Sequence, residues 1–221
     1  MQTLLKLIEK TPENSLIVAP ELCLTGFAYD NYEKALDFAD IANNKLQKAS
    51  KNKIIILSIL QRSENEVFNF AKIFFNGGIV YERAKAKLFR FGNEHKYMSE
   101  GDEKKIEIIE VDGIKIGVLI CFELRFKDIW QKFEGADVIA VPSWWGVLRS
   151  EHFKTLTQAL AIMNQCYVVA SDSLNEHCSK MSGIISPMGD VKRNGNLTCL
   201  EVKYNKKECQ KMRRYMDVGI K

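Results

Sequence analysis

The chain has 221 residues, of which 46% are hydrophobic and 27% charged, as in an ordinary soluble globular protein. No stretch approaches the roughly 20 apolar residues that cross a bilayer, so we expect no membrane partner. The net charge of +4 is small, and its basic surplus lies in the segment from about residue 203 onward. Because no aromatic interleaving and no known motif accompany these charges, we expect no nucleic-acid partner and a solvated or subunit-contacting tail.

One domain over residues 1–221 is expected, since no internal repeat and no Gly/Ser-rich linker divides the chain. The six cysteines include no C-x-x-C pair and are spread through apolar segments, which predicts buried free thiols rather than a disulfide framework. Residues 1–10 contain no apolar signal core, so a cytoplasmic location is the default.

Apolar runs and helical spacings alternate along the chain. The predicted elements, in chain order, are strand 15–20, helix 31–51, strands 53–60, 68–75, 79–84, 106–111 and 114–120, helix 125–133, strand 138–141, helix 151–164, and strands 167–171, 183–186 and 197–202. In helix 151–164, the residues expected to face inward are Phe153, Leu156, Leu160 and Met163. Asn76-Gly77-Gly78 and Asp112-Gly113 predict hairpin turns. Helices alternating with strands and hairpins indicate an α/β layered fold with mixed sheets.

Three of the predicted strands end in a residue that carries chemistry. Glu21 follows strand 15–20, Lys87 follows strand 79–84, and Cys121 follows strand 114–120. Side chains at the ends of strands are fixed by the sheet and reachable from loops. Each has a bland alternative: a small core cysteine, a capping or salt-bridged glutamate, or a surface lysine.

Other chemistries have weaker support. The three histidines lack metal-ligand spacing, and no G-x-S-x-G, P-loop or G-x-G-x-x-G motif occurs. A Cys–His hydrolase with His95 or His152 as the base stays open. A cysteine nucleophile needs partial exposure and either a base or a positive field, and Glu21 is the candidate base for Cys121.

The three segments together resemble the nitrilase or carbon–nitrogen hydrolase superfamily, whose members carry Glu, Lys and Cys in this order at strand ends. The matching stretches are APELCLTGF around Glu21, KLFR from Lys87, and ICFELRF around Cys121. The resemblance implies an α-β-β-α sandwich with two mixed sheets, assembled as a homodimer or larger homo-oligomer. It also implies a second active-site glutamate at Glu94 and needs neither a metal nor an organic cofactor.

In the mechanism that the resemblance implies, Glu21 takes the thiol proton, Cys121 attacks the carbonyl carbon and a thioester forms. Lys87 and the backbone N–H of Phe122 stabilise the oxyanion. In three respects the chain departs from the pattern. It begins at the first helix, Leu160 and Met163 stand where relatives commonly carry Arg and Glu, and Glu123 stands two residues after the nucleophile, where Asp is commoner.

Within the superfamily the chain is most similar to the omega-amidase type, which hydrolyses the terminal amide of 2-oxo-dicarboxylic monoamides. Such a substrate needs a cation for its free carboxylate, and Arg149 and Arg125 are candidates, with Trp144 and Trp145 as walls of the pocket. Arg125 in a structural ion pair and a packing role for Trp144 and Trp145 are the alternatives. Hydrolysis of an N-carbamoyl amino acid, or a silent binding or scaffold role, also stays open.

Overall fold

Residues 1–105 form one compact unit in the computed structural model, which describes residues 1–193 and 197–220 of the chain. Its mixed sheet consists of β1 (Ser15–Val18), β2 (Lys53–Ser63), β3 (Glu66–Phe75) and β4 (Gly78–Ala84), in this order. β1 is parallel to β2, whereas β3 is antiparallel to both of its neighbours. Asn76 and Gly77 both have positive φ, 46° and 86°, so the predicted turn between β3 and β4 is confirmed.

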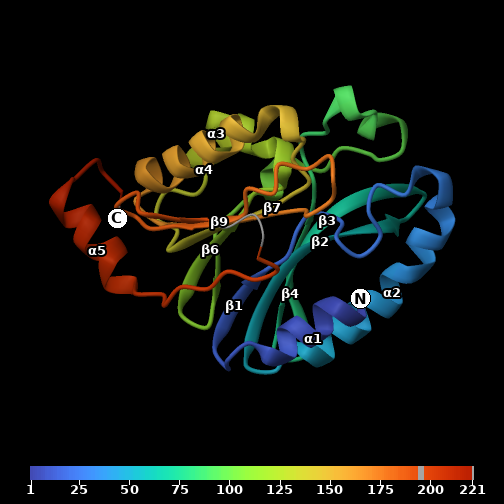
Figure 1. Ribbon diagram of the computed structural model, residues 1–221, viewed down its shortest axis with the longest axis horizontal. Helices are drawn as coiled ribbons and strands as arrows, with labels where there is room; N and C mark the ends of the chain where they lie inside the picture. Colours follow the sequence, from blue (N-terminus) through green and yellow to red (C-terminus); the bar gives the residue numbers. More distant parts are fainter. Residues whose placement is uncertain (194–196, 221) are drawn as a thin grey trace. The chain divides into compact units, whose positions relative to one another are not determined.

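Two helices, α1 (Gln2–Lys10) and α2 (Tyr32–Ala49), run beside the strands of this sheet (Figure 1). The buried stripe of α2 recurs every three or four residues, which is the spacing of one helix face. Together with Ile8 of α1 it packs on alternate residues of β2. The core of this layer consists of Ile8, Ala19, Ala39, Ala42, Leu46, Ile55, Leu57, Ile59 and Phe74.

The second compact unit, residues 106–221, contains a mixed sheet that has six strands in the described residues. They are β5 (Ile109–Val111), β6 (Ile114–Val118), β7 (Val138–Ser143), β8 (Tyr167–Asp172), β9 (Gly183–Ile185) and β10 (Val191–Arg193), arranged in the order β10-β9-β8-β7-β6-β5. β6, β7 and β8 are parallel, and the outer pairings are antiparallel. The predicted turn at Asp112 and Gly113 is confirmed, with φ of 51° and 72°.

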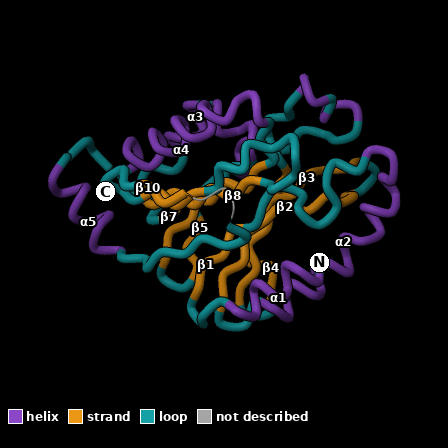
Figure 2. The backbone as a smooth tube through the Cα atoms, viewed as in Figure 1, coloured by secondary structure: helices purple, strands orange, loops and turns teal. Residues whose placement is uncertain are grey.

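Helices α3 (Lys127–Gln131) and α4 (Ser150–Asn164) lie next to each other, with α4 against β8 and β9 (Figure 2). The buried residues of α4 are Phe153, Thr157, Leu160, Ala161 and Asn164. Met163 lies outside this stripe with 65% of its surface exposed, so the prediction that it faces inward is wrong.

The end of the described chain differs from the sequence-based expectation. Residues 197–202 form no strand, and the last strand of the sheet is β10, which pairs with β9 through its backbone. The basic segment forms helix α5 (Lys206–Tyr215), with Cys209 and Met212 buried beneath it. This segment is therefore packed on one side rather than wholly solvated. No helix in the described ranges is long and apolar enough to cross a membrane.

Candidate active site

Glu21 lies in the turn that follows β1, and its side chain is 0% exposed. The turn is fixed to β2 by two hydrogen bonds: Ala19 N–H donates to the Ile56 carbonyl, and Leu22 N–H donates to Ser58 Oγ. Leu22 has a left-handed backbone, with φ of 44°. The sheet therefore determines where the Glu21 carboxylate lies.

A buried lysine joins two carboxylates in this unit. Lys85 Nζ lies 2.7 Å from Glu21 Oε1 and 2.9 Å from Glu94 Oε1. Asn69 Nδ2 donates a 2.8 Å hydrogen bond to Glu21 Oε1, and Phe89 N–H donates one of 2.9 Å to Glu94 Oε2. Exposure is 0% for Glu21 and Lys85 and 3% for Glu94. We call Glu21, Lys85 and Glu94 the ion cluster.

The backbone of Lys85 is held on both sides. Its N–H donates to the Asn69 carbonyl, and its carbonyl accepts from Gly101 N–H, each over 2.8 Å. A Cβ atom at Gly101 would lie 2.5 Å from the carbonyl oxygen of Ala84, so only glycine allows this close approach. Pairing with β3 thus continues past the end of β4 and carries the lysine into the ion cluster.

Lys87 lies elsewhere. Its side chain is 28% exposed, and its Nζ lies 2.5 Å from Glu103 Oε2, whose side chain is 34% exposed. The chain bends at Ala86 and Lys87, which separates the two lysines. The prediction that Lys87 stands beside Glu21 is therefore wrong, and Lys85 occupies that position. Glu94, in contrast, lies at the lysine of the cluster, in the 3-10 helix η3 (Glu94–Lys96).

Cys121 lies where β6 ends, as the first residue of the 3-10 helix η5 (Cys121–Arg125). Its φ is 45°, a conformation that costs a non-glycine residue on the order of 1–3 kcal/mol and that concentrates at functional sites. Glu123 Oε2 accepts a 2.7 Å hydrogen bond from Ile120 N–H, which fixes the turn from within. Cys121 is 8% exposed and Glu123 is 0% exposed. No feature of the sequence signals this strained backbone at the cysteine.

Arg125 and Arg149 lie in the same compact unit as Cys121. Burial and the neighbouring Arg149 lower the pKa of the Arg125 guanidinium, while Cys121 raises it. The Arg125 guanidinium lies 4.9 Å from the centre of the Trp145 ring and 3.0 Å from His152 Nδ1. The structure thus brings Arg125 and Arg149, the two predicted carboxylate binders, near each other and near the thiol. A positive field of this kind favours the thiolate form of a cysteine.

The segment that carries Arg149 is held by Trp145. The Trp145 indole N–H donates a 2.8 Å hydrogen bond to the Arg149 carbonyl, and its backbone N–H donates one of 2.7 Å to Asp172 Oδ1. Trp145 is 3% exposed and packs against Phe153, whereas Trp144 is half-buried. Trp145 is therefore a packing residue, and Trp144 is the more accessible of these two neighbours.

None of the six cysteines, all within the described residues, forms a disulfide, so the prediction of free thiols is confirmed. Burial raises the pKa of the Cys23 thiol to about 12 and that of Cys209 to about 11. Cys199 is exposed. In the described residues, no group of three or more His, Cys, Asp or Glu side chains is arranged to hold a metal ion.

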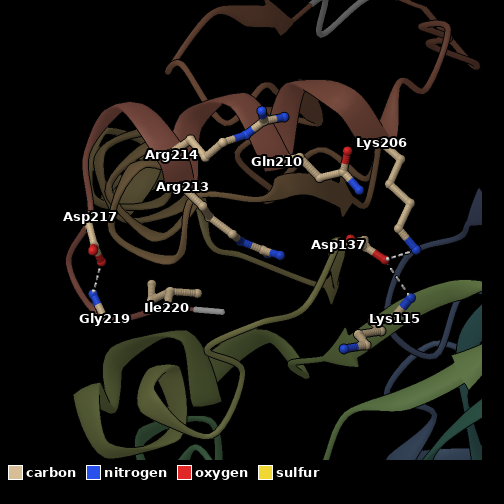
Figure 3. Close-up of a pocket in the computed structure, with 9 residues that line it drawn as sticks. All are labelled: Lys115, Asp137, Lys206, Gln210, Arg213, Arg214, Asp217, Gly219 and Ile220. Carbon is tan, nitrogen blue, oxygen red and sulfur yellow. Dashed lines mark hydrogen bonds and ion pairs between the residues drawn. The ribbon is translucent and has the colours of Figure 1, made fainter.

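A separate cavity of about 890 Å³ opens beside α5 (Figure 3). Asp137 pairs there with Lys206 at 3.3 Å, and its carboxylate accepts a hydrogen bond from Lys115 N–H. The full lining comprises Lys115, Asp137, Lys206, Gln210, Arg213, Arg214, Asp217, Gly219 and Ile220. No predicted catalytic residue lines this cavity.

The chain is similar to known proteins over most of its length. The carbon–nitrogen hydrolase family model matches residues 1–204. The chain is 35% identical to a 2-oxoglutaramate amidase from Bacillus subtilis (strain 168), with 85% of this chain and 76% of the relative covered. It is 31% identical to the omega-amidase YafV of Escherichia coli (strain K12), with 83% of this chain and 73% of the relative covered.

Solved structures show the same fold. XC1258 from Xanthomonas campestris, described as a CN-hydrolase superfamily protein with an arsenic adduct in its active site, superposes with a TM-score of 0.81 at 23% identity, covering 98% of this chain and 86% of that one. Saccharomyces cerevisiae Nit3, described as a member of the nitrilase superfamily, gives a TM-score of 0.81 at 19% identity over 99% and 86%. The predicted fold class is confirmed. The family match also confirms the predicted enzyme class, a hydrolase of carbon–nitrogen bonds. The chain belongs to the carbon–nitrogen hydrolase family.

Proposed function

We propose that the protein is a cysteine-dependent amidase that releases ammonia from a small linear amide, with Glu21, Lys85 and Cys121 acting on the same substrate. The observation that carries this proposal is the buried Lys85 ammonium, held at 2.7 Å by Glu21 and at 2.9 Å by Glu94. Burying a lysine between two carboxylates is costly for a fold, and charged groups kept in this way concentrate at functional sites.

The first half of the reaction makes a thioester. Glu21 accepts the thiol proton of Cys121, and the sulfur attacks the carbonyl carbon of the amide. The electron pair of the C=O bond moves to oxygen, where the Lys85 ammonium and the backbone N–H of Phe122 stabilise the charge. Preorganised donors of this kind contribute on the order of 3 kcal/mol each. Glu21 then gives its proton to the nitrogen as the C–N bond breaks, and ammonia leaves.

The second half regenerates the thiol. Glu21 takes a proton from water, and the hydroxyl oxygen attacks the thioester carbon. The C–S bond breaks, the carboxylic acid leaves, and Glu21 returns the proton to the sulfur. Glu94 keeps Lys85 oriented by its 2.9 Å contact and is itself held by Phe89 N–H. The lysine thus stays in place through both halves.

For the substrate we favour a 2-oxo-dicarboxylic monoamide such as 2-oxoglutaramate. Two relatives at 31% and 35% identity carry the names omega-amidase and 2-oxoglutaramate amidase. The pair Arg125 and Arg149 offers a positive site for the free carboxylate of such a molecule, because a guanidinium binds a carboxylate through two parallel hydrogen bonds. Trp144 would form a wall beside it.

The test is ammonia release from matched panels: 2-oxoglutaramate and 2-oxosuccinamate, simple aliphatic amides, and N-carbamoyl amino acids. We expect the first group to have the highest kcat/KM, and Cys121→Ala to release no ammonia while remaining folded. Hydroxylamine added during turnover should yield the hydroxamate of the acyl group from the thioester. Preference for the N-carbamoyl compounds would change the substrate class, and inactivity on all panels would favour a binding or scaffold role.

A homo-oligomer remains our proposal for the assembly. Support comes from apolar residues exposed on and beside α4, namely Ile162 at 42%, Met163 at 65% and Met188 at 61%. Sedimentation of the wild type against Met188→Glu tests it, because a charge on a face between copies should dissociate them.

A further inference from the structure

The loop that carries Glu94 is tied to the segment that follows Glu21. Tyr29, in the 3-10 helix η1 (Tyr29–Asn31), donates a 3.4 Å hydrogen bond from its hydroxyl to the Gly92 carbonyl. Its ring stacks on that of Tyr97, with centroids 3.9 Å apart and planes at 10°. Tyr32, the first residue of α2, donates from its hydroxyl to the Tyr97 carbonyl. Three contacts from one segment therefore hold the loop on either side of Glu94.

The middle of this loop is held by short-range backbone hydrogen bonds and by the contacts of Glu94 with Lys85 and Phe89 N–H. Leu88 and Met98 are buried at its two ends, in a cluster against which the Tyr29 ring packs. Between them Phe91 is 86% exposed, and Asn93 takes a left-handed backbone with φ of 61°. A short, exposed turn with few apolar contacts opens easily unless side chains from elsewhere close it.

Tyr29 also lies within the electric field of the ion cluster. The pKa of its phenol is raised, first by burial and then by Glu94 and Glu21, while Lys85 lowers it. The groups that face this phenol thus include all three members of the cluster. Tyr29 therefore both holds the loop and lies near the ion cluster, to which the loop contributes Glu94.

We propose that Tyr29 is a positioning residue that, by stacking on Tyr97 and bonding to Gly92, keeps the Glu94 carboxylate on the Lys85 ammonium. This inference rests on the proposed amidase function for its kinetic consequence, but not for its structural one. The stack supplies most of the effect, because the hydrogen bond to Gly92 is long at 3.4 Å. Loss of the ring should let Glu94 drift, and displacement of about 1 Å in a catalytic group can lower the rate on the order of 100-fold.

The kinetic test is a double-mutant cycle between Tyr29→Ala and Glu94→Gln, with Tyr29→Phe to keep the ring and Tyr215→Phe as the control. Tyr215 is 83% exposed on α5, in the other compact unit. We expect Tyr29→Ala to lower kcat by about 10- to 100-fold with a smaller change in KM, and Tyr29→Phe by no more than about threefold. In the Glu94→Gln background, Tyr29→Ala should cost less than about threefold, because residues that act through one another are not additive. Equal losses in both backgrounds would overturn the proposal.

The structural test does not depend on turnover. Phe89 N–H is protected by Glu94 Oε2, so its hydrogen exchange reports whether Glu94 is in place. We expect exchange in residues 88–98 to quicken by about tenfold or more in Tyr29→Ala and to stay unchanged in Tyr29→Phe and Tyr215→Phe. Unchanged protection in Tyr29→Ala would refute the positioning role, whereas a wild type inactive on every amide would refute only the proposed function.

Discussion

Replacing Lys85 and Lys87 by methionine in two separate variants tests which of the two lysines acts in the reaction. Lys85→Met removes the ammonium but keeps most of the side-chain volume. It leaves Glu21 and Glu94, which are 0% and 3% exposed, without the cation between them. Removing one partner of a buried ion pair costs roughly 3–5 kcal/mol, so we expect the free energy of unfolding to fall by about that amount.

Lys87→Met is the matched control. The side chains of Lys87 and Glu103 are 28% and 34% exposed, and pairs with this much access to water contribute only about 0.2–1 kcal/mol. Urea unfolding followed by circular dichroism should therefore show a shift below about 1 kcal/mol for Lys87→Met and a several-fold larger one for Lys85→Met.

Activity should divide in the same way. Loss of an oxyanion donor lowers kcat by about 100- to 1,000-fold, and we expect this for Lys85→Met in ammonia release measured well below its unfolding midpoint. Lys87→Met should stay within about threefold of the wild type. If Lys87→Met abolishes activity while Lys85→Met turns over normally, the lysine of the ion cluster is structural and our assignment fails.

Three further predictions concern the second unit. A thiol reagent should label Cys121 faster than any other cysteine once the exposed Cys199 is replaced by Ser, because burial raises the pKa of Cys23 and Cys209; peptide mapping that finds another site first would contradict this. Burial raises the pKa of the Asp172 carboxyl above its ordinary 3.8, so the folded state holds that proton more tightly than the unfolded chain; the stability of the wild type relative to Asp172→Asn should therefore fall as pH rises from about 3.8 through the raised pKa, measured by urea unfolding across pH. Gly117→Ala should lower the free energy of unfolding by roughly 1–3 kcal/mol, since its Cβ would lie 2.5 Å from the Phe133 ring; a thermal melt unchanged from the wild type would refute this.

The parts of the fold that could be predicted are those with a local cause. The turns at Asn76-Gly77 and Asp112-Gly113 require positive φ, and Asn, Asp and Gly are the residue types that adopt it most readily. Apolar runs located β1 and β6, and with them Glu21 and Cys121. In each case a short stretch of sequence carries the whole signal.

A local sequence signal could not identify Lys85, rather than Lys87, as the lysine of the ion cluster. Lys85 and Lys87 are two residues apart, so alternation along a strand places both on one side and cannot rank them. What selects Lys85 is backbone pairing with Asn69 and the close approach of Gly101, both of which depend on tertiary structure.

The missed elements at the end of the chain have a related cause. β10 is short and polar, and it exists because its backbone bonds to β9. Helix α5 is mostly charged and buries only Cys209 and Met212. Two apolar residues are too few to predict a helix from their spacing.

The ion cluster takes its three side chains from positions 21, 85 and 94, ahead of the nucleophile at position 121. A ribosome adds about 5–20 residues each second, so the last glutamate leaves it some seconds or less before the cysteine does. The acid and the amine therefore leave the ribosome before the reactive sulfur does. Vectorial synthesis thus presents the three side chains of the ion cluster to solvent ahead of the thiol.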